Sequence, residues 1–193
     1  MSKLIVISGP SGVGKGTIVS HLKDIYAINN DKLYLSVSFT TRSPRDGEED
    51  GVNYHFISLN EFKERIKKHD FLEYNLYGTG KYYGTGRSTV LKYLDDGYDV
   101  LLEIDINGYK QIKKNFPDAV GIFIMPPVIE ELYNRLKNRN TETEDVIKVR
   151  LETAKKEIAE RDIYDHIVVN ENDKSREAAL EIYSIIKGEI KND

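Results

Sequence analysis

Short apolar runs alternate along the chain with segments whose apolar residues recur every three or four positions. The apolar runs predict buried strands, and the helical spacing predicts amphipathic helices between them. The strands are expected at 3–8, 98–105, 119–125 and 166–169, and the helices at 14–26, 88–94, 129–137, 146–161 and 175–187. Strands that alternate with helices predict an α/β fold with a parallel sheet covered on both faces.

One stretch, from Leu33 to Tyr83, breaks this alternation. Residues 33–39 alternate like a second strand, a polar loop covers 40–53, and a short strand is expected at 54–57. Ser58 and Glu61 have the spacing of a capping box at the start of a further helix. The stretch is therefore predicted to be a small mixed α/β subdomain inserted into the main fold.

Composition narrows the classes of protein. The 193 residues, with 39% hydrophobic and 31% charged, suit one globular domain. A net charge of −4 argues against nucleic-acid binding, and the absence of Cys excludes disulfides, thiol catalysis and cysteine-held metals. The first apolar run, Leu4 to Ile7, is too short for a signal peptide or membrane span, so a cytoplasmic protein without membrane contact is expected. The four histidines do not cluster, which disfavours a histidine metal site.

A glycine-rich loop follows the first predicted strand and precedes the first predicted helix, and its sequence is GPSGVGKGT. Glycines let successive backbone N–H groups face one anion, the helix N-terminus adds its positive end, and Lys15 adds a mobile charge. The alternative is a purely structural glycine-rich turn, which the position of the motif between a strand and a helix disfavours. The residues expected to hold the phosphates of a nucleoside triphosphate here are Gly9, Pro10, Ser11, Gly12, Val13, Gly14, Lys15, Gly16 and Thr17.

Gly16 departs from the usual phosphate loop, where a Ser or Thr ligates Mg²⁺. Thr17 is the nearest hydroxyl. We therefore expect Mg²⁺ to be held by nucleotide phosphates and water, with Glu103 and Asp105 as candidate second-layer carboxylates. Glu103 and Asp105 lie two residues apart at the end of a predicted strand, so their side chains are expected to point the same way. The alternative roles for this pair are guanine binding and the stabilisation of a strand-end turn.

Two further clusters suggest the phosphate acceptor. Arg42 and Arg45 lie three apart near Tyr54 and suit a dianionic phosphate, although a solvated charged loop is the alternative. Glu73 stands among apolar and aromatic residues, where a carboxylate needs a partner. Guanine presents two adjacent N–H donors that match one carboxylate, and adenine does not. A pocket with Glu73, Ser38 and Thr85 would therefore select guanine.

Arginines border a polar segment at 138–144. Arg135 and Arg139 share a helix face, and Arg150 follows the segment. Such a pattern is typical of an exposed, salt-bridged helix, but it also suits a lid that excludes water from a phosphoryl-transfer site.

Taken in order, these motifs resemble the guanylate kinase family over nearly the whole length. The matching stretches are GPSGVGKGT, SVSFTTRSPRDGE, VNYHF, FLEY, KYYGT, LEIDING, NRLKNRNTETE and VVN. The resemblance implies that ATP is bound by the glycine-rich loop with Asn170 near the adenine. It implies catalytic charges from Lys15, Arg42, Arg135, Arg139 and Arg150, and GMP contacts from Ser38, Arg42, Arg45, Tyr54, Glu73, Tyr83, Thr85 and Asp105.

The implied fold is a P-loop NTPase-type five-stranded parallel sheet flanked by helices, with its core at 1–32, 88–125 and 158–193. A GMP-binding insertion is expected at 33–87 and a helical lid at 126–157. The implied reaction is MgATP plus GMP to ADP plus GDP, with dGMP giving dGDP in the same way, in purine nucleotide metabolism. A non-catalytic guanylate kinase-like scaffold and a kinase for AMP or UMP are the alternatives. The sequence leaves monomer or homodimer open, and the segment between Glu73 and Tyr83 is one residue longer than the family spacing, which predicts an outward bulge.

Overall fold

The computed structural model describes residues 2–78, 80–138 and 143–189. Within them the chain forms a five-stranded sheet of order β2-β7-β1-β8-β9 and a four-stranded sheet of order β4-β3-β6-β5. The five-stranded sheet is parallel and flanked by helices, which confirms the predicted fold class. Two compact units divide the chain, Met1–Leu4 with Tyr34–Ala119 and Ile5–Leu33 with Val120–Asp193.

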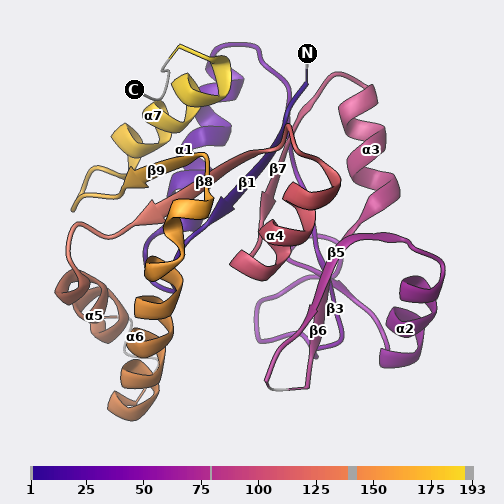
Figure 1. The fold of residues 1–193 in the computed structure, drawn as a ribbon, viewed down its shortest axis with the longest axis horizontal. Coiled ribbons are helices and arrows are strands. Elements are labelled where there is room, and N and C mark those ends of the chain that lie inside the picture. Colours follow the sequence, from indigo (N-terminus) through magenta and orange to yellow (C-terminus); the bar gives the residue numbers. More distant parts are fainter. Residues whose placement is uncertain (1, 79, 139–142, 190–193) are drawn as a thin grey trace. The chain divides into compact units, whose positions relative to one another are not determined.

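The unit that contains the glycine-rich loop is built on β1, β8 and β9, drawn in Figure 1 with the loop leading from β1 into α1. Ile5 pairs with Val120, and Ile122 pairs with His166, in parallel register. Helices α1 and α7 lie side by side (Figure 1), and Tyr26 meets Tyr183 edge-on at 5.2 Å. The elements are β1 Leu4–Ser8, α1 Lys15–Ile28, β8 Val120–Met125, α5 Ile129–Asn138, α6 Glu144–Ala159, a 3₁₀ turn Arg161–Ile163, β9 His166–Val169 and α7 Ser175–Lys187.

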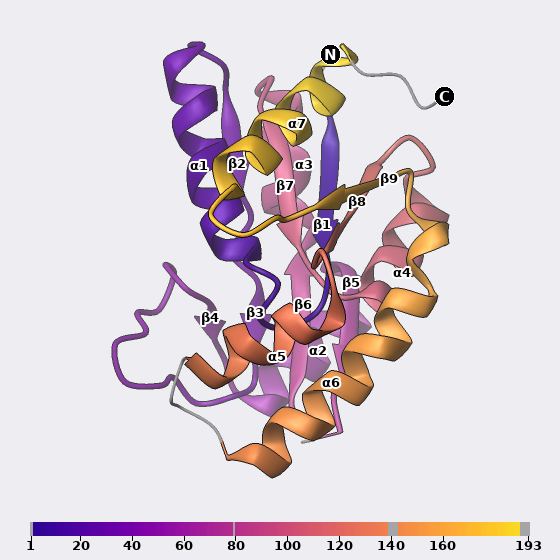
Figure 2. The same cartoon turned by 90° about the vertical axis from the view of Figure 1, so that its left-hand side faces the viewer.

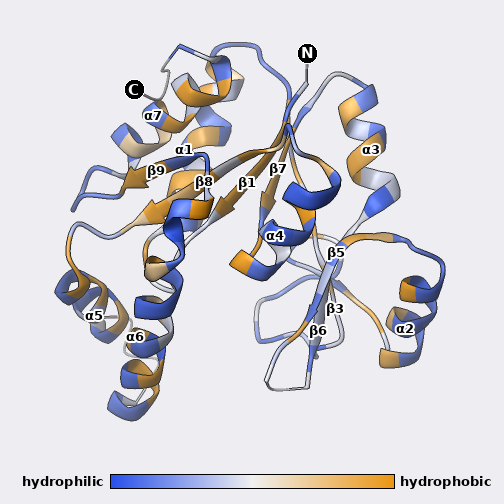
Figure 3. Cartoon of the chain, in the orientation of Figure 1, coloured by the Kyte–Doolittle hydropathy of each residue, from blue (hydrophilic) through white to orange (hydrophobic). Residues whose placement is uncertain are grey.

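Apolar side chains fill the interior of this unit. Figure 3 shows β1 and β8 as hydrophobic strands, whereas α6 is largely hydrophilic along its length. Ile5, Val6 and Ile7 are fully buried, as their β-branched run predicts. The predicted bounds of the last helix, 175–187, are those observed. None of the helices in the described ranges is both long and apolar enough to cross a membrane.

The other unit contains the mixed sheet, in which β3 runs parallel to β4 and antiparallel to β6. Figure 2 shows these strands with helix α2 nearby. Phe62 of α2 stacks on Phe71 of β5 at 4.4 Å and forms a core beneath the sheet. The elements are β2 Leu33–Leu35, β3 Phe39–Thr40, β4 His55–Phe56, α2 Leu59–Lys67, β5 Phe71–Leu76, β6 Tyr82–Gly86, α3 Arg87–Asp95, β7 Asp99–Glu103 and α4 Ile106–Asn115.

Two sequence-based expectations are wrong here. Residues 33–39 do not form one strand, because β2 ends at Leu35 and β3, which begins at Phe39, belongs to the other sheet. The strand expected at 98–105 ends at Glu103, and Asp105 is instead the N-cap of α4, where its side chain accepts a hydrogen bond from Gly108 N at 2.8 Å. Asp105 keeps an extended backbone but lies beyond the end of β7, so Glu103 and Asp105 do not share a face of this strand.

The predicted capping box is half formed. Ser58 caps α2 by accepting from Glu61 N at 3.1 Å, as expected. The Glu61 carboxylate, however, accepts from Arg65 one turn along the helix. The second expected cap, at 141–144, falls partly outside the described residues, and α6 has Thr143 at its N-cap position.

Candidate functional site

The glycine-rich loop has the backbone of an anion-binding loop. Gly9, Gly12 and Gly14 all have positive φ, at 149°, 89° and 98°. At Gly14 a Cβ would also lie 2.5 Å from Asn170 Nδ2, so both conformation and space demand glycine there. The Lys15 ammonium folds back over the loop and donates to Gly9 O at 2.6 Å and Pro10 O at 3.1 Å.

Asn170 is packed beneath this loop and is only 2% exposed. Its Nδ2 donates to Val13 O at 2.7 Å, which fixes the orientation of the amide because a carbonyl can only accept. Asn170 Oδ1 is then left buried without a hydrogen-bond donor among the described residues. A buried acceptor of this kind suits an N–H of a bound ligand.

Two of the predicted arginines are tied to the loop. Arg135 of α5 donates to Val13 O and Asn170 O, both at 3.0 Å. Arg150 of α6 donates to Ser11 Oγ at 2.6 Å. The structure therefore brings both side chains to the loop predicted to hold phosphate, whereas Arg139 lies outside the described residues.

A cavity of about 430 Å³ opens beside the loop. Its lining is polar and includes Gly14, Thr17, Arg135 and Asn170. Gly16 has no atom within 4 Å of the place where a Cβ would stand. The cavity thus lies against the loop, the buried amide of Asn170 and one arginine, a combination that suits a nucleotide with its phosphates on the loop.

In the other unit, Glu73 is a buried carboxylate with a hydroxyl partner. It is 5% exposed, and Thr85 Oγ1 donates to its Oε1 at 2.7 Å across the β5–β6 pair. Burial raises the pKa of Glu73 to about 7, against the smaller lowering effect of the Thr85 hydrogen bond, and the charge of Asp105 raises it further. Thr85 is therefore the hydrogen-bond partner that the sequence predicts for a carboxylate among apolar residues.

Asp105 is a second carboxylate beside this pair. Its Oδ1 accepts from Gly108 N at 2.8 Å and from Asn75 Nδ2 at 3.0 Å, and its Oδ2 accepts from the Tyr77 hydroxyl at 2.8 Å. The site therefore holds two acidic groups whose acceptor oxygens are oriented by the surrounding chain.

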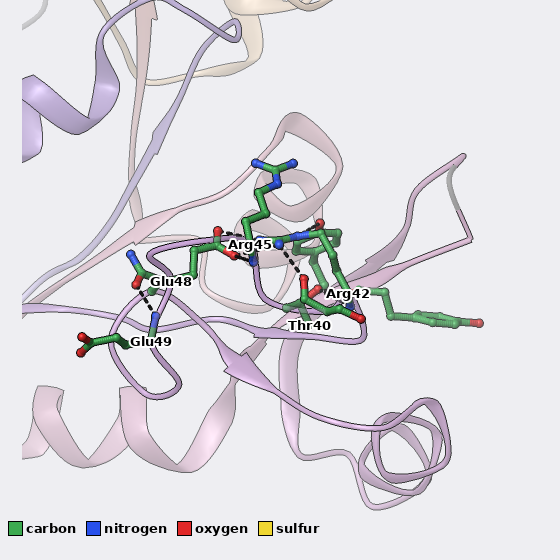
Figure 4. A network of polar contacts seen from close by, with 9 residues as sticks. Thr40, Arg42, Arg45, Glu48 and Glu49 are labelled. Carbon is green, nitrogen blue, oxygen red and sulfur yellow. Dashed lines mark hydrogen bonds and ion pairs between the residues drawn. The ribbon is translucent and has the colours of Figure 1, made fainter. Parts of the chain in front are cut away.

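Arg42 lies in a polar network on the loop after β3 (Figure 4). Its two terminal nitrogens donate to the two oxygens of Glu48, both at 2.8 Å, and its Nε donates to the Tyr83 hydroxyl at 3.2 Å. The hydrogen bonds from Arg42, and then from Arg45 N, lower the pKa of Glu48 to about 2, and Glu48 raises the pKa of Arg42. Glu48 therefore stays ionised and keeps the guanidinium in one orientation.

The remaining predicted residues surround this network. Tyr54 and Tyr83 meet edge-on at 5.8 Å, and the Arg42 guanidinium lies 5.4 Å from the Tyr54 ring. The Arg45 guanidinium extends away from Glu48 (Figure 4) and is exposed. Ser38 precedes β3, and its carbonyl accepts from His55 N at 2.9 Å. The sequence thus located a cluster of cationic and phenolic groups of the kind that holds phosphate.

Three residues of the site escaped the sequence reasoning. Glu48 ends the stretch SVSFTTRSPRDGE, and its spacing of six from Arg42 was the available signal. Asn75 and Tyr77 contact Asp105 from 30 and 28 residues away, and no local pattern marks them. On either side of residue 79, which lies outside the described residues, nothing lies within 4 Å of a Cβ at Gly78 or Gly80.

The chemistry of the two clusters defines a class. A phosphate loop with its lysine binds nucleoside triphosphates, and a buried carboxylate near a fixed arginine suits a purine monophosphate. Among proteins with a parallel P-loop sheet, this combination is typical of nucleoside monophosphate kinases.

Comparison with known proteins identifies the family within that class. The guanylate kinase family model matches residues 1–188. The chain is 49% identical to a guanylate kinase of Clostridium tetani over 96% of this chain and 86% of the relative, and 46% identical to one of Prochlorococcus marinus over 97% and 98%. The crystal structure of guanylate kinase from Anaplasma phagocytophilum matches with a TM-score of 0.74 at 29% identity, covering 99% of this chain and 87% of the other. The chain belongs to the guanylate kinase family, whose members are ATP:GMP phosphotransferases.

Proposed function

We propose that this chain transfers the γ-phosphoryl group of ATP to GMP, giving ADP and GDP, and to dGMP, giving ADP and dGDP, in purine nucleotide metabolism. The observation that carries the choice of acceptor is the buried Glu73, held by Thr85 at 2.7 Å. An ionised carboxylate accepts two parallel hydrogen bonds, and guanine offers two adjacent donors at N1 and the exocyclic amine. Adenine and uracil offer no such pair, so the pocket favours GMP over AMP and UMP.

The phosphate of GMP would be bound by Arg42, Arg45, Tyr54 and Tyr83. Support comes from the Arg42 guanidinium, whose Nε is already bonded to Tyr83 and whose outer nitrogens are held by Glu48. One N–H of Arg42 has no partner among the described residues after these bonds and its bond to Ser43 O are counted. Arg42 would donate this N–H to the phosphate and would hold a positive charge in a fixed position beside it. Arg45 would contribute a second positive charge on an exposed side chain that is free to move. Ser38 and Thr85 would complete the contacts to the base.

ATP would lie along the loop from Gly9 to Thr17, with its phosphates on the backbone N–H groups and Lys15. The adenine amine would donate to Asn170 Oδ1, the buried acceptor that lacks a donor in the described chain. Mg²⁺ bound to the ATP phosphates would neutralise the charge that develops there during transfer. The space at Gly16 and the hydroxyl of Thr17 fit an ion held by phosphates and water, and Glu103 is the proposed carboxylate for that water. We propose that Asp105 binds the guanine base and not the water of the Mg²⁺ ion, because three donors already orient its carboxylate.

We propose that residues 33–87 bind GMP and that the remaining core binds ATP. Residues 126–157, with Arg135 and Arg150, would form the lid that excludes water. Both side chains contact the loop through Val13 O and Ser11 Oγ. Water exclusion matters because water competes with GMP as acceptor.

A coupled ADP-release assay with MgATP tests the proposal. GMP and dGMP should give turnover far above AMP, UMP and a blank without acceptor. Lys15→Ala should abolish turnover with every acceptor, whereas Glu73→Gln should lower turnover with GMP selectively. Absence of acceptor-dependent turnover would identify a non-catalytic binding module instead.

A further inference from the structure

Tyr77 stands at the start of the extended turn between β5 and β6. Its backbone carbonyl accepts from Gly80 N at 2.8 Å and its N–H donates to Lys81 O at 3.0 Å, so the turn closes on Tyr77 itself. From this position the phenol hydroxyl donates to Asp105 Oδ2 at 2.8 Å. Burial, followed by the charge of Asp105 and the hydrogen bond to it, raises the pKa of Tyr77 well above its usual range. The hydroxyl is therefore a donor throughout the physiological pH range.

The acceptor positions of Asp105 can be counted. A carboxylate has about four lone-pair sites, two on each oxygen. Gly108 N and Asn75 Nδ2 occupy both sites on Oδ1, and the Tyr77 hydroxyl occupies one on Oδ2. One site is left, and it lies on the oxygen that Tyr77 orients.

The donors of guanine can be counted in the same way. The N1 position carries one N–H and the exocyclic amine carries two, so that edge of the base presents three hydrogens. A fork to Glu73 uses N1–H and one hydrogen of the amine. The second amine hydrogen needs another acceptor, and an unmade bond there would be costly in a buried pocket.

We infer that Tyr77 is a positioning residue that sets base specificity, because its hydroxyl aims the one open acceptor of Asp105 at the second hydrogen of the guanine amine. The inference rests on the proposed GMP pocket of Glu73 and Asp105. The substrate feature it concerns is the exocyclic amine, which distinguishes GMP from IMP, a nucleotide that keeps N1–H and lacks the amine.

The position of the Tyr77 ring supports a role limited to the base end. The ring packs edge-on against Tyr83 at 5.1 Å, and Tyr83 accepts from Arg42 at the proposed phosphate end. A change that keeps the ring and removes only the hydroxyl therefore leaves the phosphate contacts in place. Tyr77→Phe is that change.

The experiment measures Kd for GMP and for IMP by calorimetry, together with KM and kcat for GMP. Tyr77→Phe should raise Kd and KM for GMP about tenfold, the size expected for losing a hydrogen bond to a charged group. Kd for IMP should change by less than about twofold, so that the GMP preference falls about tenfold. The rate kcat at saturating GMP should be retained. Tyr74→Phe, on the same hairpin and 39% exposed, is the matched control and should leave both Kd values unchanged.

A double-mutant cycle shows whether Tyr77 acts through Asp105. In an Asp105→Asn background, which keeps a good helix N-cap, Tyr77→Phe should have little further effect on the GMP preference. Equal losses for GMP and IMP in Tyr77→Phe, or a full tenfold effect in the Asp105→Asn background, would overturn the inference. Tyr77→Leu removes the hydroxyl together with the ring, so if the phenylalanine variant does not fold, only the ratio of the GMP and IMP Kd values is compared in Tyr77→Leu, because both nucleotides share the phosphate contacts.

A further comparison of variants distinguishes failure of the proposed base pocket from failure of the role of Tyr77. If Glu73→Gln and Asp105→Asn both keep the wild-type GMP preference, the proposed base pocket itself is wrong. If they lose that preference while Tyr77→Phe and Tyr77→Leu keep it, the pocket stands and only the role of Tyr77 is wrong.

Discussion

The carboxylate of Glu73 packs directly against Gly108 in the first turn of α4. A Cβ at Gly108 would lie 2.8 Å from Glu73 Oε2, although the backbone there is ordinary right-handed helix. Glycine is needed at this position for space, not for conformation. The same residue donates its N–H to Asp105, so the two carboxylates of the proposed base pocket meet at one glycine.

Gly108→Ala should therefore weaken GMP binding while the fold is retained. Alanine favours the helix by about 0.5–1 kcal/mol over glycine, but its methyl group displaces the Glu73 carboxylate. We expect KM for GMP to rise at least about tenfold with KM for ATP unchanged, which steady-state kinetics measure. Asn107→Ala, on the exposed side of the same turn, is the control. Normal GMP kinetics in Gly108→Ala would show that Glu73 is free to move aside.

GMP binding should release protons near neutral pH. Glu73 has a pKa of about 7 in the free protein, and the fork to guanine requires its ionised form. At pH 7 about half of the molecules must lose a proton on binding, so about 0.5 proton is released per GMP. Calorimetry in buffers of different ionisation enthalpy measures this number. Glu73→Gln should bring it close to zero, and an unchanged value in that variant would assign the proton to another group.

The same carboxyl should make the free protein less stable as pH rises. Its pKa is raised from 4.5 to about 7 on folding, so the folded state binds the proton more tightly than the unfolded state. Stability from this group is intact below pH 4.5, falls between pH 4.5 and 7, and is lower by about 3 kcal/mol above pH 7. Urea denaturation at pH 5 and pH 8 should show Glu73→Gln gaining over the wild type mainly at pH 8. An equal difference at both pH values would contradict the raised pKa.

Glu48→Gln should impair the phosphate end of the GMP site. The change removes the ionic fork that holds both terminal nitrogens of Arg42, so the guanidinium loses its fixed orientation. We expect KM for GMP to rise about tenfold and KM for ATP to stay the same, as kinetic titrations of each substrate will show. Glu49→Gln, an exposed neighbour, is the matched control. A lower KM for GMP would mean that Glu48 competes with the phosphate instead of positioning Arg42.

Gly16→Ser should be tolerated and should ease the Mg²⁺ requirement. No atom lies within 4 Å of a Cβ at Gly16, and the residue is in the first turn of α1. A hydroxyl there takes the place of the usual loop ligand, so the Mg²⁺ concentration for half-maximal rate should fall. Gly16→Ala separates the two effects, because it should raise the free energy of unfolding by up to about 1 kcal/mol without shifting the Mg²⁺ dependence. If both variants shift it equally, the hydroxyl is not a ligand.

The sequence predicted those features of the molecule that depend on residues close together in the chain. The glycine-rich loop lies between β1 and α1 as its sequence indicates, and the burial of Glu73 follows from its apolar neighbours. Helix α4 was missed because Gly108 and several lysines weaken its pattern, although Ile106, Tyr109 and Ile112 recur at helical spacing.

The contacts that complete the site could not be predicted in this way. The Tyr77–Asp105 bond joins the β5–β6 turn to the residue before α4, and its formation depends on how β5 packs against α4. A separation of 28 residues carries no periodic signal. The extra residue in the turn was visible in the sequence, whereas the direction taken by the Tyr77 side chain required the fold.

The N-cap role of Asp105 has an evolutionary consequence. A lineage that changed its base preference at this position would have to keep an acceptor for Gly108 N, since loss of an N-cap costs about 1 kcal/mol. Of the available side chains, Asn, Ser and Thr satisfy the cap, and only Asn also keeps the length of the aspartate. A change of nucleotide preference through position 105 is therefore restricted to these few residue types, because variants without the cap would have a less stable α4 and would be selected against.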